Sequence, residues 1–343
     1  MTLTVAPFSG SAAEWDTFAA TAAGSTHCHA FGWKALLGDV FGHECLYYEA
    51  REAHGALAGV LPLVRVKSLL FGHYLVSMPF LNYGGPLGHA AAVQALADHA
   101  RAEAERSKAK LLELRSRTAL PLDFPVSHRK VTVVLELPPD ADTLWKAFPA
   151  KLRSQIRRPQ KEGLVARFGS DQVAPFFSVF SRHMRHLGTP TLPLRFFQAL
   201  GDGFPEQAWF GCVYSGNAPV AGGAGFRWGG EFEMTWASSL SEHARLAPNM
   251  LLYWAFMEHA IANGLARFNF GRCTPGGGTH RFKRQWEGHD EPLWWYQVAR
   301  GGAAEASTPS PDDGAYAWGP RIWRRLPLPL ATALGPRIVR FIP

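Results

Sequence analysis

The residues best suited to chemistry lie between residues 249 and 286. This stretch predicts a helix, then a short buried strand that ends at Gly271 and Arg272, then a glycine-rich turn that carries Phe282, Lys283 and Trp286. A strand end holds polar groups rigidly, and glycines let a ligand approach the backbone closely. Arg272 has two interpretations: a bidentate clamp for a phosphate or carboxylate group, or a member of an internal salt bridge.

Four more polar or aromatic side chains are expected to line the same pocket, and two from the first half of the chain are expected to bind an acceptor. The four are Asn249, Tyr253, Glu233 and Trp236, and the two are Asn82 and Tyr83. No residue stands out as a general base. His183 and His186 lie on a predicted helix, where we interpret them as ordinary surface residues. Substrate-assisted or water-relayed proton transfer is therefore the expectation.

The cysteines and histidines do not predict a metal site. Cys28, Cys45, Cys212 and Cys273 are scattered without a CxxC pair. Residues 27–29 read His-Cys-His, but no second cluster follows. Four cysteines in 343 residues favour reduced thiols in the cytosol. Since the N-terminus does not resemble a signal peptide and no apolar run reaches about 18 residues, we expect a cytoplasmic protein.

Composition indicates an ordinary globular protein with a sizeable core and an anionic partner. The chain is 47% hydrophobic and 18% charged, with a formal net charge of +7. The positive charge favours RNA, a phosphorylated sugar, CoA or an acidic membrane face, without choosing among them.

A repeated hairpin indicates how these residues are positioned. A strand at 209–214, a turn at Gly216 and a strand from Val220 repeat a pattern of strand, turn at Gly55 and strand from Leu57. The two turn glycines lie 161 residues apart, as two copies of one fold would place them. We therefore predict two similar α/β domains, 1–145 and 146–300, followed by a linker and tail at 301–343.

The connector between the two predicted domains is strongly basic. Five basic residues and no acid stand in eleven positions, namely Lys151, Arg153, Arg157, Arg158 and Lys161. Arg153 and Arg157 share one face of a helix, and Pro159 is expected to kink that helix or end it. The connector is either an anion platform that holds tRNA or another anionic substrate, or a solvated basic face.

The tail at residues 319–343 carries five arginines, no acid and several interleaved leucines. It predicts a short basic amphipathic element. Such an element either docks peripherally on anionic lipid or packs across the second domain.

Two motifs carry a resemblance to a known family. They are Phe268-Asn269-Phe270-Gly271-Arg272 and Phe282-Lys283-Arg284-Gln285-Trp286. With further matches between residues 25 and 298, the chain resembles the FemAB-like acyltransferases with tandem GNAT folds, above all the subgroup associated with exosortase and PEP-CTERM exopolysaccharide systems. Two departures stand out: Asn269 replaces an expected Asp, and residues 285–288 replace a more usual Asn-Trp-Gly.

The resemblance implies the fold and the chemistry. The fold class would be α/β (α+β), with two GNAT-type domains, each a twisted, mostly antiparallel sheet flanked by helices. The donor would be an aminoacyl-tRNA, and the acceptor an amine of a peptide- or saccharide-containing envelope or exopolysaccharide precursor. By the same resemblance, Phe282 would stack near the terminal adenosine and Lys283 would stabilise the developing oxyanion.

Two other functions stay open. The first is an acyl-CoA-dependent GNAT N-acyltransferase, which would cradle the CoA pyrophosphate in a glycine-rich loop at a helix N-terminus. Residues 244–249 contain no glycine, and residues 84–88 are a weaker candidate. The second is a non-catalytic protein that binds tRNA or polysaccharide on the same fold. No cofactor is expected beyond the donor itself, charged tRNA or acyl-CoA.

Overall fold

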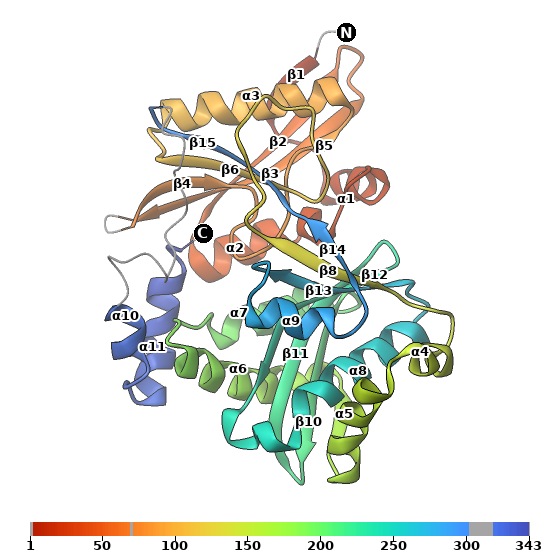
Figure 1. Cartoon of the computed structure of the whole chain (residues 1–343). Coiled ribbons are helices and arrows are strands. Elements are labelled where there is room, and N and C mark those ends of the chain that lie inside the picture. The colour runs from red at the N-terminus through yellow and green to blue at the C-terminus, as the bar shows by residue number, and fades with distance from the viewer. Residues whose placement is uncertain (1–2, 69–70, 302–317, 343) are drawn as a thin grey trace. The chain divides into compact units, whose positions relative to one another are not determined.

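The computed structural model describes residues 3–68, 71–301 and 318–342, and the chain divides into two compact units (Figure 1). Unit 1 comprises Met1–Lys130, Pro292–Asp313 and Ile338–Pro343. Unit 2 comprises Val131–Glu291 and Gly314–Arg337. Each unit is built on one sheet.

Unit 1 contains a mixed, mostly antiparallel sheet. Its strands follow the order β1 (Leu3–Pro7), β2 (Glu44–Glu52), β3 (Leu57–Ser68), β4 (Gly72–Val76), β6 (Leu111–Ser116), β15 (Trp294–Ala299) and β7 (Val126–Ser127), with β5 (Leu87–Gly88) paired to β3. Its helices are α1 (Ala12–Thr21), α2 (Trp33–Phe41) and α3 (Ala90–Arg106). The pair β4–β6 is parallel, because α3 crosses between the two strands.

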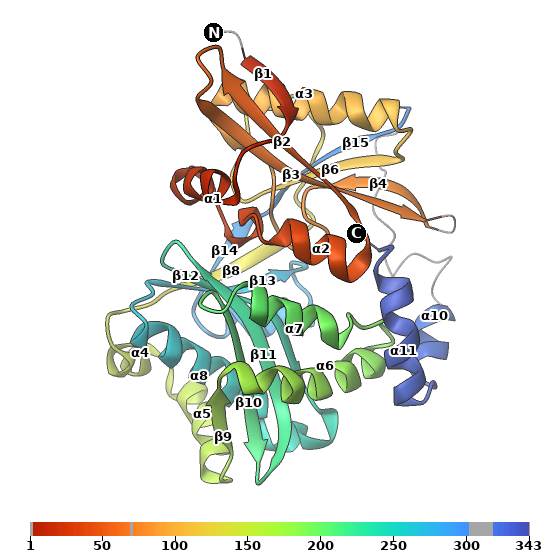
Figure 2. The same cartoon turned by 180° about the vertical axis from the view of Figure 1, so that it is seen from behind.

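Unit 2 repeats this plan. Its strands follow the order β14 (His289–Pro292), β8 (Val131–Glu136), β13 (Arg267–Cys273), β12 (Glu231–Ser239), β11 (Ala218–Trp228), β10 (Ala208–Ser215) and β9 (Val165–Phe168). Its helices are α4 (Ala141–Ala147), α5 (Ala150–Lys161), α6 (Val173–Leu187), α7 (Leu194–Gly203), α8 (Pro248–Ala262), α9 (Gly278–Arg284), α10 (Trp318–Trp323) and α11 (Leu328–Val339). Figure 2 shows the unit from behind, where α6 and α7 cover one face of the sheet. The pair β12–β13 is parallel, with α8 as its crossover helix.

The expected α/β class with two similar, mostly antiparallel sheets and flanking helices is confirmed. The hairpins β2–β3 and β10–β11 occupy matching places, as do the parallel pairs β4–β6 and β12–β13. One strand in each sheet comes from an unexpected part of the chain. β8 falls within the first predicted domain, 1–145, but it pairs with β13 in unit 2, while β15 pairs with β6 in unit 1. Antiparallel pairing across such long separations leaves no local sequence pattern.

The connector helix also differs from expectation. α5 continues past Pro159 to Lys161, and Pro159 is buried together with Leu152 and Ile156. Because Pro159 lies in the last turn of the helix, its missing N–H and ring disturb only the end. The buried stripe leaves the basic residues of α5 on the outer face.

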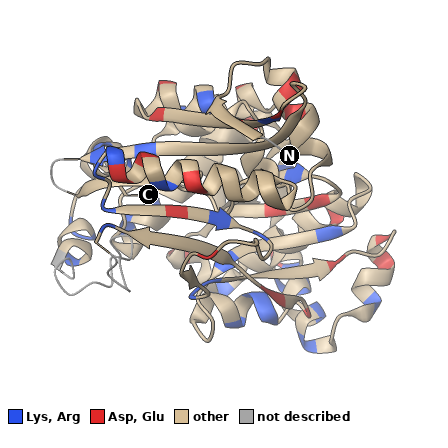
Figure 3. Cartoon of the chain, turned by 90° about the horizontal axis from the view of Figure 1, so that it is seen from above, with Lys and Arg blue, Asp and Glu red and all other residues tan. Residues whose placement is uncertain are grey.

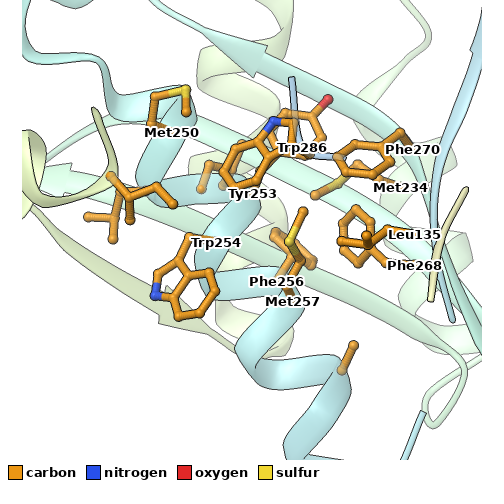
Figure 4. Close-up of a cluster of buried hydrophobic side chains, with 14 of the residues drawn as sticks. Leu135, Met234, Met250, Tyr253, Trp254, Phe256, Met257, Phe268, Phe270 and Trp286 are labelled. Carbon is orange, nitrogen blue, oxygen red and sulfur yellow. The ribbon is translucent and has the colours of Figure 1, made fainter. Parts of the chain in front are cut away.

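The core of unit 2 centres on α8. Phe256 and Met257 of this helix are fully buried and pack over Phe268 and Phe270 of β13, with Trp286 in the same cluster (Figure 4). Apolar residues on nearly every side of α8 fit a helix enclosed between the sheet and neighbouring helices. This packing fixes the first turn of α8 beside the parallel strands.

Candidate active site

The two parallel strands of unit 2 separate after three paired positions. β12 and β13 pair from Glu231 opposite Arg267 to Glu233 opposite Asn269. Beyond this point β12 stays paired only to β11 and β13 only to β8. Both strands also carry an extra residue at this point. Between two successive paired positions, β12 advances by three residues while β11 advances by two. In the same way β13 advances by three residues while β8 advances by two. Such bulges bend a strand and redirect its side chains.

A cavity of about 310 Å³ lies beside the free part of β12. Its lining comes from α6, β12, α8 and the α9 region, and consists of His183, Ala237, Ser238, Ser239, Asn249, Leu252, Tyr253, Gly278, Thr279 and Phe282. The lining combines hydroxyl, amide and imidazole groups with two aromatic rings. A volume of this size suits an acyl group and the atoms next to it.

His183 is the titratable group of this lining whose properties match a base. Burial, assisted by the neighbouring His186, lowers the pKa of His183 below its ordinary value of 6.5, while the backbone carbonyl of Ser239 opposes this shift. The imidazole is therefore neutral at pH 7. A neutral imidazole carries a lone pair on one ring nitrogen, which can accept a proton. The sequence alone does not distinguish His183 from His186, because the difference depends on burial by other elements: His183 is partly buried and His186 is exposed.

Two further polar side chains belong to the same cavity. The hydroxyl of Ser238 is buried and has no hydrogen-bond partner within the described part of the chain. Tyr253 is enclosed by Phe270 and Phe282, whose ring centroids lie 5.6 and 5.1 Å from its own. Burial raises the pKa of Tyr253, so its phenol stays protonated and can act only as a neutral group.

Asn269 holds the end of β13 in shape. Its Oδ1 accepts from the Gly271 N–H at 2.8 Å and from the Thr132 hydroxyl, and its Nδ2 donates to Glu231 at 3.0 Å. Gly271 has φ +71°, a conformation that favours glycine. An amide is suited to this position because it accepts from two donors and also donates to a carboxylate. Aspartate, expected from the resemblance, would place two carboxylates together.

Lys283 contacts the same strand end. It lies on α9 rather than on a turn, is 4% exposed, and donates from Nζ to the carbonyls of Gly271 at 2.6 Å and Arg272 at 2.9 Å. Burial, together with the Arg272 charge, lowers its pKa to about 8, while Cys273 and Glu233 oppose this shift. Lys283 thus satisfies carbonyls that a bulged strand leaves without a ladder partner.

The other expected site residues divide into two groups. Asn249, Tyr253 and Phe282 line the cavity, whereas Glu233 and Trp236 do not. Glu233 is buried at the last position where β12 and β13 pair. Trp236 packs against Phe196 and Phe197 of α7.

Trp286 and the connector arginines also lie outside the lining. Trp286 has no exposed surface and packs against Phe148 and Phe270, so it supports the site from behind. Arg157 lies over the ring of Trp145 at 5.0 Å, and Arg153 is half-buried on α5. Arg272 is exposed at the strand end.

The corresponding place in unit 1 is filled. β4 and β6 also pair at only three positions, but beyond them the fully buried Arg115 forms an ion pair with Glu113 at 2.7 Å. Arg115 also donates to the carbonyls of Met78 and Leu81. Asn82 and Tyr83 are expected to bind an acceptor, yet they are 5% and 0% exposed, so each lies buried.

Comparison with known proteins agrees with this architecture. Residues 146–284 match the family model described as acetyltransferase (GNAT) domain. The crystal structure of FemX is similar with a TM-score of 0.65 at 14% identity, covering 87% of this chain and 98% of that one. No curated protein sequence matches the chain.

Two other solved structures share the fold. L-PGS from Bacillus licheniformis has a TM-score of 0.56 at 12% identity, covering 96% of both chains. A tandem GNAT protein from the clavulanic acid biosynthesis pathway, solved without AcCoA, has a TM-score of 0.51 at 13% identity and covers 89% of this chain and 100% of that one. The chain therefore has a tandem GNAT fold, and the residues that match the acetyltransferase (GNAT) domain model lie in unit 2.

The described residues contain neither a membrane-spanning helix nor a cluster of metal ligands. No helix among them is long and apolar enough to cross a membrane. No group of three or more His, Cys, Asp or Glu side chains among residues 3–68, 71–301 and 318–342 is arranged to hold a metal ion.

The Asn269 network predicts a pH-dependent loss of stability in Asn269→Asp. Burial and the nearby Glu231 would raise the pKa of the introduced carboxyl above its unfolded value of about 3.9. The folded form therefore keeps its proton longer, and stability falls as pH rises through that raised pKa. We expect a loss of about 1–3 kcal/mol at pH 7.5 that is smaller at pH 4, measured by urea denaturation. Asn217→Asp in the exposed hairpin turn is the control, and an equal effect of both changes at both pH values would contradict the network.

The contacts of Lys283 predict that Lys283→Met destabilises unit 2. The change leaves the carbonyls of Gly271 and Arg272 buried without their donor, at a cost of about 1–3 kcal/mol. Urea denaturation of this variant, compared with Lys161→Met on the exposed face of α5, measures the difference. Equal stability of the two variants would mean that the ammonium does not support the strand end.

Proposed function

We propose that this protein transfers an acyl or aminoacyl group to an amine of a cell-envelope or exopolysaccharide precursor, in the cavity beside the separated strands of unit 2. The observation that carries the proposal is this cavity, which lies where the parallel pair of a GNAT-type sheet opens and which includes a neutral imidazole. The matching place in unit 1 is occupied by Arg115 and Glu113. Unit 1 therefore acts as support in this proposal.

The chemistry of acyl transfer assigns roles to the lining. The attacking amine must lose a proton, the carbonyl oxygen must be stabilised as it becomes negative, and the two reactants must be held in line. His183 takes the amine proton as the amine nitrogen bonds to the acyl carbon. The bond from that carbon to the donor's ribose oxygen then breaks, and the leaving oxygen receives the proton from His183. Phe282 and Tyr253 supply aromatic surfaces that orient the donor, and the Ser238 hydroxyl is a donor that a substrate oxygen can use.

We also propose Lys283 and Arg272 as catalytic residues, and the contacts of each residue limit what it can do. Two of the three ammonium hydrogens of Lys283 bind backbone carbonyls, which leaves one for an oxyanion. Arg272 is exposed at the strand end and can clamp a phosphate of the donor. In this proposal both residues act at the end of β13, and His183 acts from the side of β12.

The proposed donor is an aminoacyl-tRNA, as in the FemAB-like family that the motifs resemble. The basic outer face of α5 supports it, because an RNA donor needs phosphate contacts outside the cavity. The start of α8 beside the cavity gives acyl-CoA little support, because Pro248 has no N–H and the Met250 N–H donates to the carbonyl of Ala247. The link to exosortase systems rests on the resemblance of the motifs alone.

A donor screen tests the proposal. Purified protein is offered charged tRNA or acetyl-CoA with amine acceptors, and products are identified by mass spectrometry. We expect aminoacyl transfer, with tRNA affinity that falls steeply as salt rises. Arg153→Ser combined with Arg157→Ser should weaken tRNA binding, whereas Arg101→Ser on α3 of unit 1 should not. Transfer from acetyl-CoA alone would replace the donor, and absence of any transfer would favour a binding protein.

His183 predicts the pH dependence of the reaction. The rate constant kcat/KM should rise through a pKa below 6.5, as His183 loses its proton, and fall near pH 8, as Lys283 loses its own. His183→Gln should lower kcat by roughly 10²- to 10⁴-fold and remove the acid limb. His186→Gln, on the same helix but exposed, is the matched control. An unchanged acid limb in His183→Gln would exclude this histidine as the base.

A further inference from the structure

Exposed aliphatic side chains gather on one part of unit 2. Within the described part of the chain five large hydrophobic residues are exposed, and three of them are Leu187 at 46%, Ile322 at 53% and Leu330 at 44%. Leu187 ends α6, Ile322 lies on α10 and Leu330 lies on α11. Both Figure 1 and Figure 2 place α10 and α11 beside the end of α6. We call this the 187/322/330 surface.

Specific contacts hold this surface in place. Arg324 donates to the carbonyl of Leu187 at 3.1 Å, and Arg185 donates to the carbonyl of Leu326 at 2.5 Å. Gly335 of α11 packs so closely on Thr191 that an added Cβ would lie 2.8 Å from the Thr191 nitrogen. The expectation that the tail packs across the second domain is therefore met by α10 and α11. Their outward side chains form a fixed surface rather than a loose tail.

The same surface is basic and lacks acids. No Asp or Glu occurs from residue 172 to 201 or from 318 to 342. Arg321 and Arg325 are exposed beside Ile322 on α10 and the turn that follows it. Figure 3 shows basic residues and no acidic ones on the helices next to the grey segment. Aliphatic side chains bordered by arginine, with no opposing charge, match the interface of an anionic bilayer.

We propose that the 187/322/330 surface docks unit 2 on an anionic lipid bilayer. The aliphatic side chains enter the headgroup region, and the arginines bind lipid phosphates around them. An RNA partner would use the arginines but gains nothing from the exposed leucine and isoleucine. The rim of a protein–protein interface is polar. A soluble acidic protein is therefore a poorer match for exposed aliphatic side chains bordered by arginines. The inference goes beyond the proposed transfer reaction, because membrane docking does not require the protein to be an enzyme. If the proposed reaction is correct, docking would bring the enzyme to the membrane surface.

Vesicle co-sedimentation of the full chain tests the proposal. The probes are vesicles of phosphatidylcholine alone and of phosphatidylcholine with phosphatidylglycerol. We expect binding to the anionic vesicles that weakens with salt, and little binding to the neutral ones. Ile322→Ser with Leu330→Ser should lower the partition coefficient roughly tenfold by removing apolar contact. Arg321→Ser with Arg325→Ser should lower it by a similar or larger factor, while leaving the Arg324 contact to Leu187 intact.

The matched control is Val165→Ser on β9, because Val165 is 48% exposed in the same unit but lies outside the surface. Circular dichroism checks that all variants fold. Vesicle binding that is retained by Val165→Ser and lost by both double variants supports the proposal. Failure of the native chain to bind anionic vesicles, or binding as strong as that of the native chain in either double variant, overturns it. Neither result depends on whether the chain transfers an acyl group.

Discussion

The site depends on how the protein satisfies the backbone where β12 and β13 separate. Parallel strands that part leave N–H and C=O groups without ladder partners, and buried groups of this kind are costly. The Asn269 side chain accepts a hydrogen bond from the Gly271 N–H, and Lys283 donates to the carbonyls of Gly271 and Arg272. With the end of β13 fixed in this way, the cavity beside β12 can stay open between α6 and α8. The polar residues of the family-like motif thus shape the end of β13 beside the cavity.

The two units resolve the same constraint differently. In unit 1 the strands β4 and β6 also part, but Arg115 and Glu113 fill the opening as a buried ion pair, and Arg115 satisfies carbonyls of residues 78 and 81. A buried pair with these extra hydrogen bonds occupies the opening in unit 1. In unit 2 the corresponding groups are satisfied from β13 and α9, and the cavity lies on the side of β12.

Local patterns in the sequence predicted much of the fold. The two hairpins were readable from strand alternation and from Gly55 and Gly216, because turn chemistry is a short-range property. The exchange of β8 and β15 was not readable, since pairing over such separations leaves no local signal. The site followed the same rule. Asn249, Tyr253 and Phe282 were expected in the pocket and line it, whereas the place of His183 in the lining depends on burial by other elements. The sequence could not show whether Trp286 is buried in the core or contacts a ligand, because aromatic residues are common in both places.

The central claim is that acyl transfer takes place in the cavity of unit 2. The most direct measurement is a crystal structure of the full chain with a non-hydrolysable analogue of an aminoacylated tRNA end. The account predicts that the aminoacyl group occupies the cavity between His183 and Phe282, with its carbonyl oxygen at the end of β13. An aminoacyl group bound elsewhere, with the cavity filled by side chains, would contradict it.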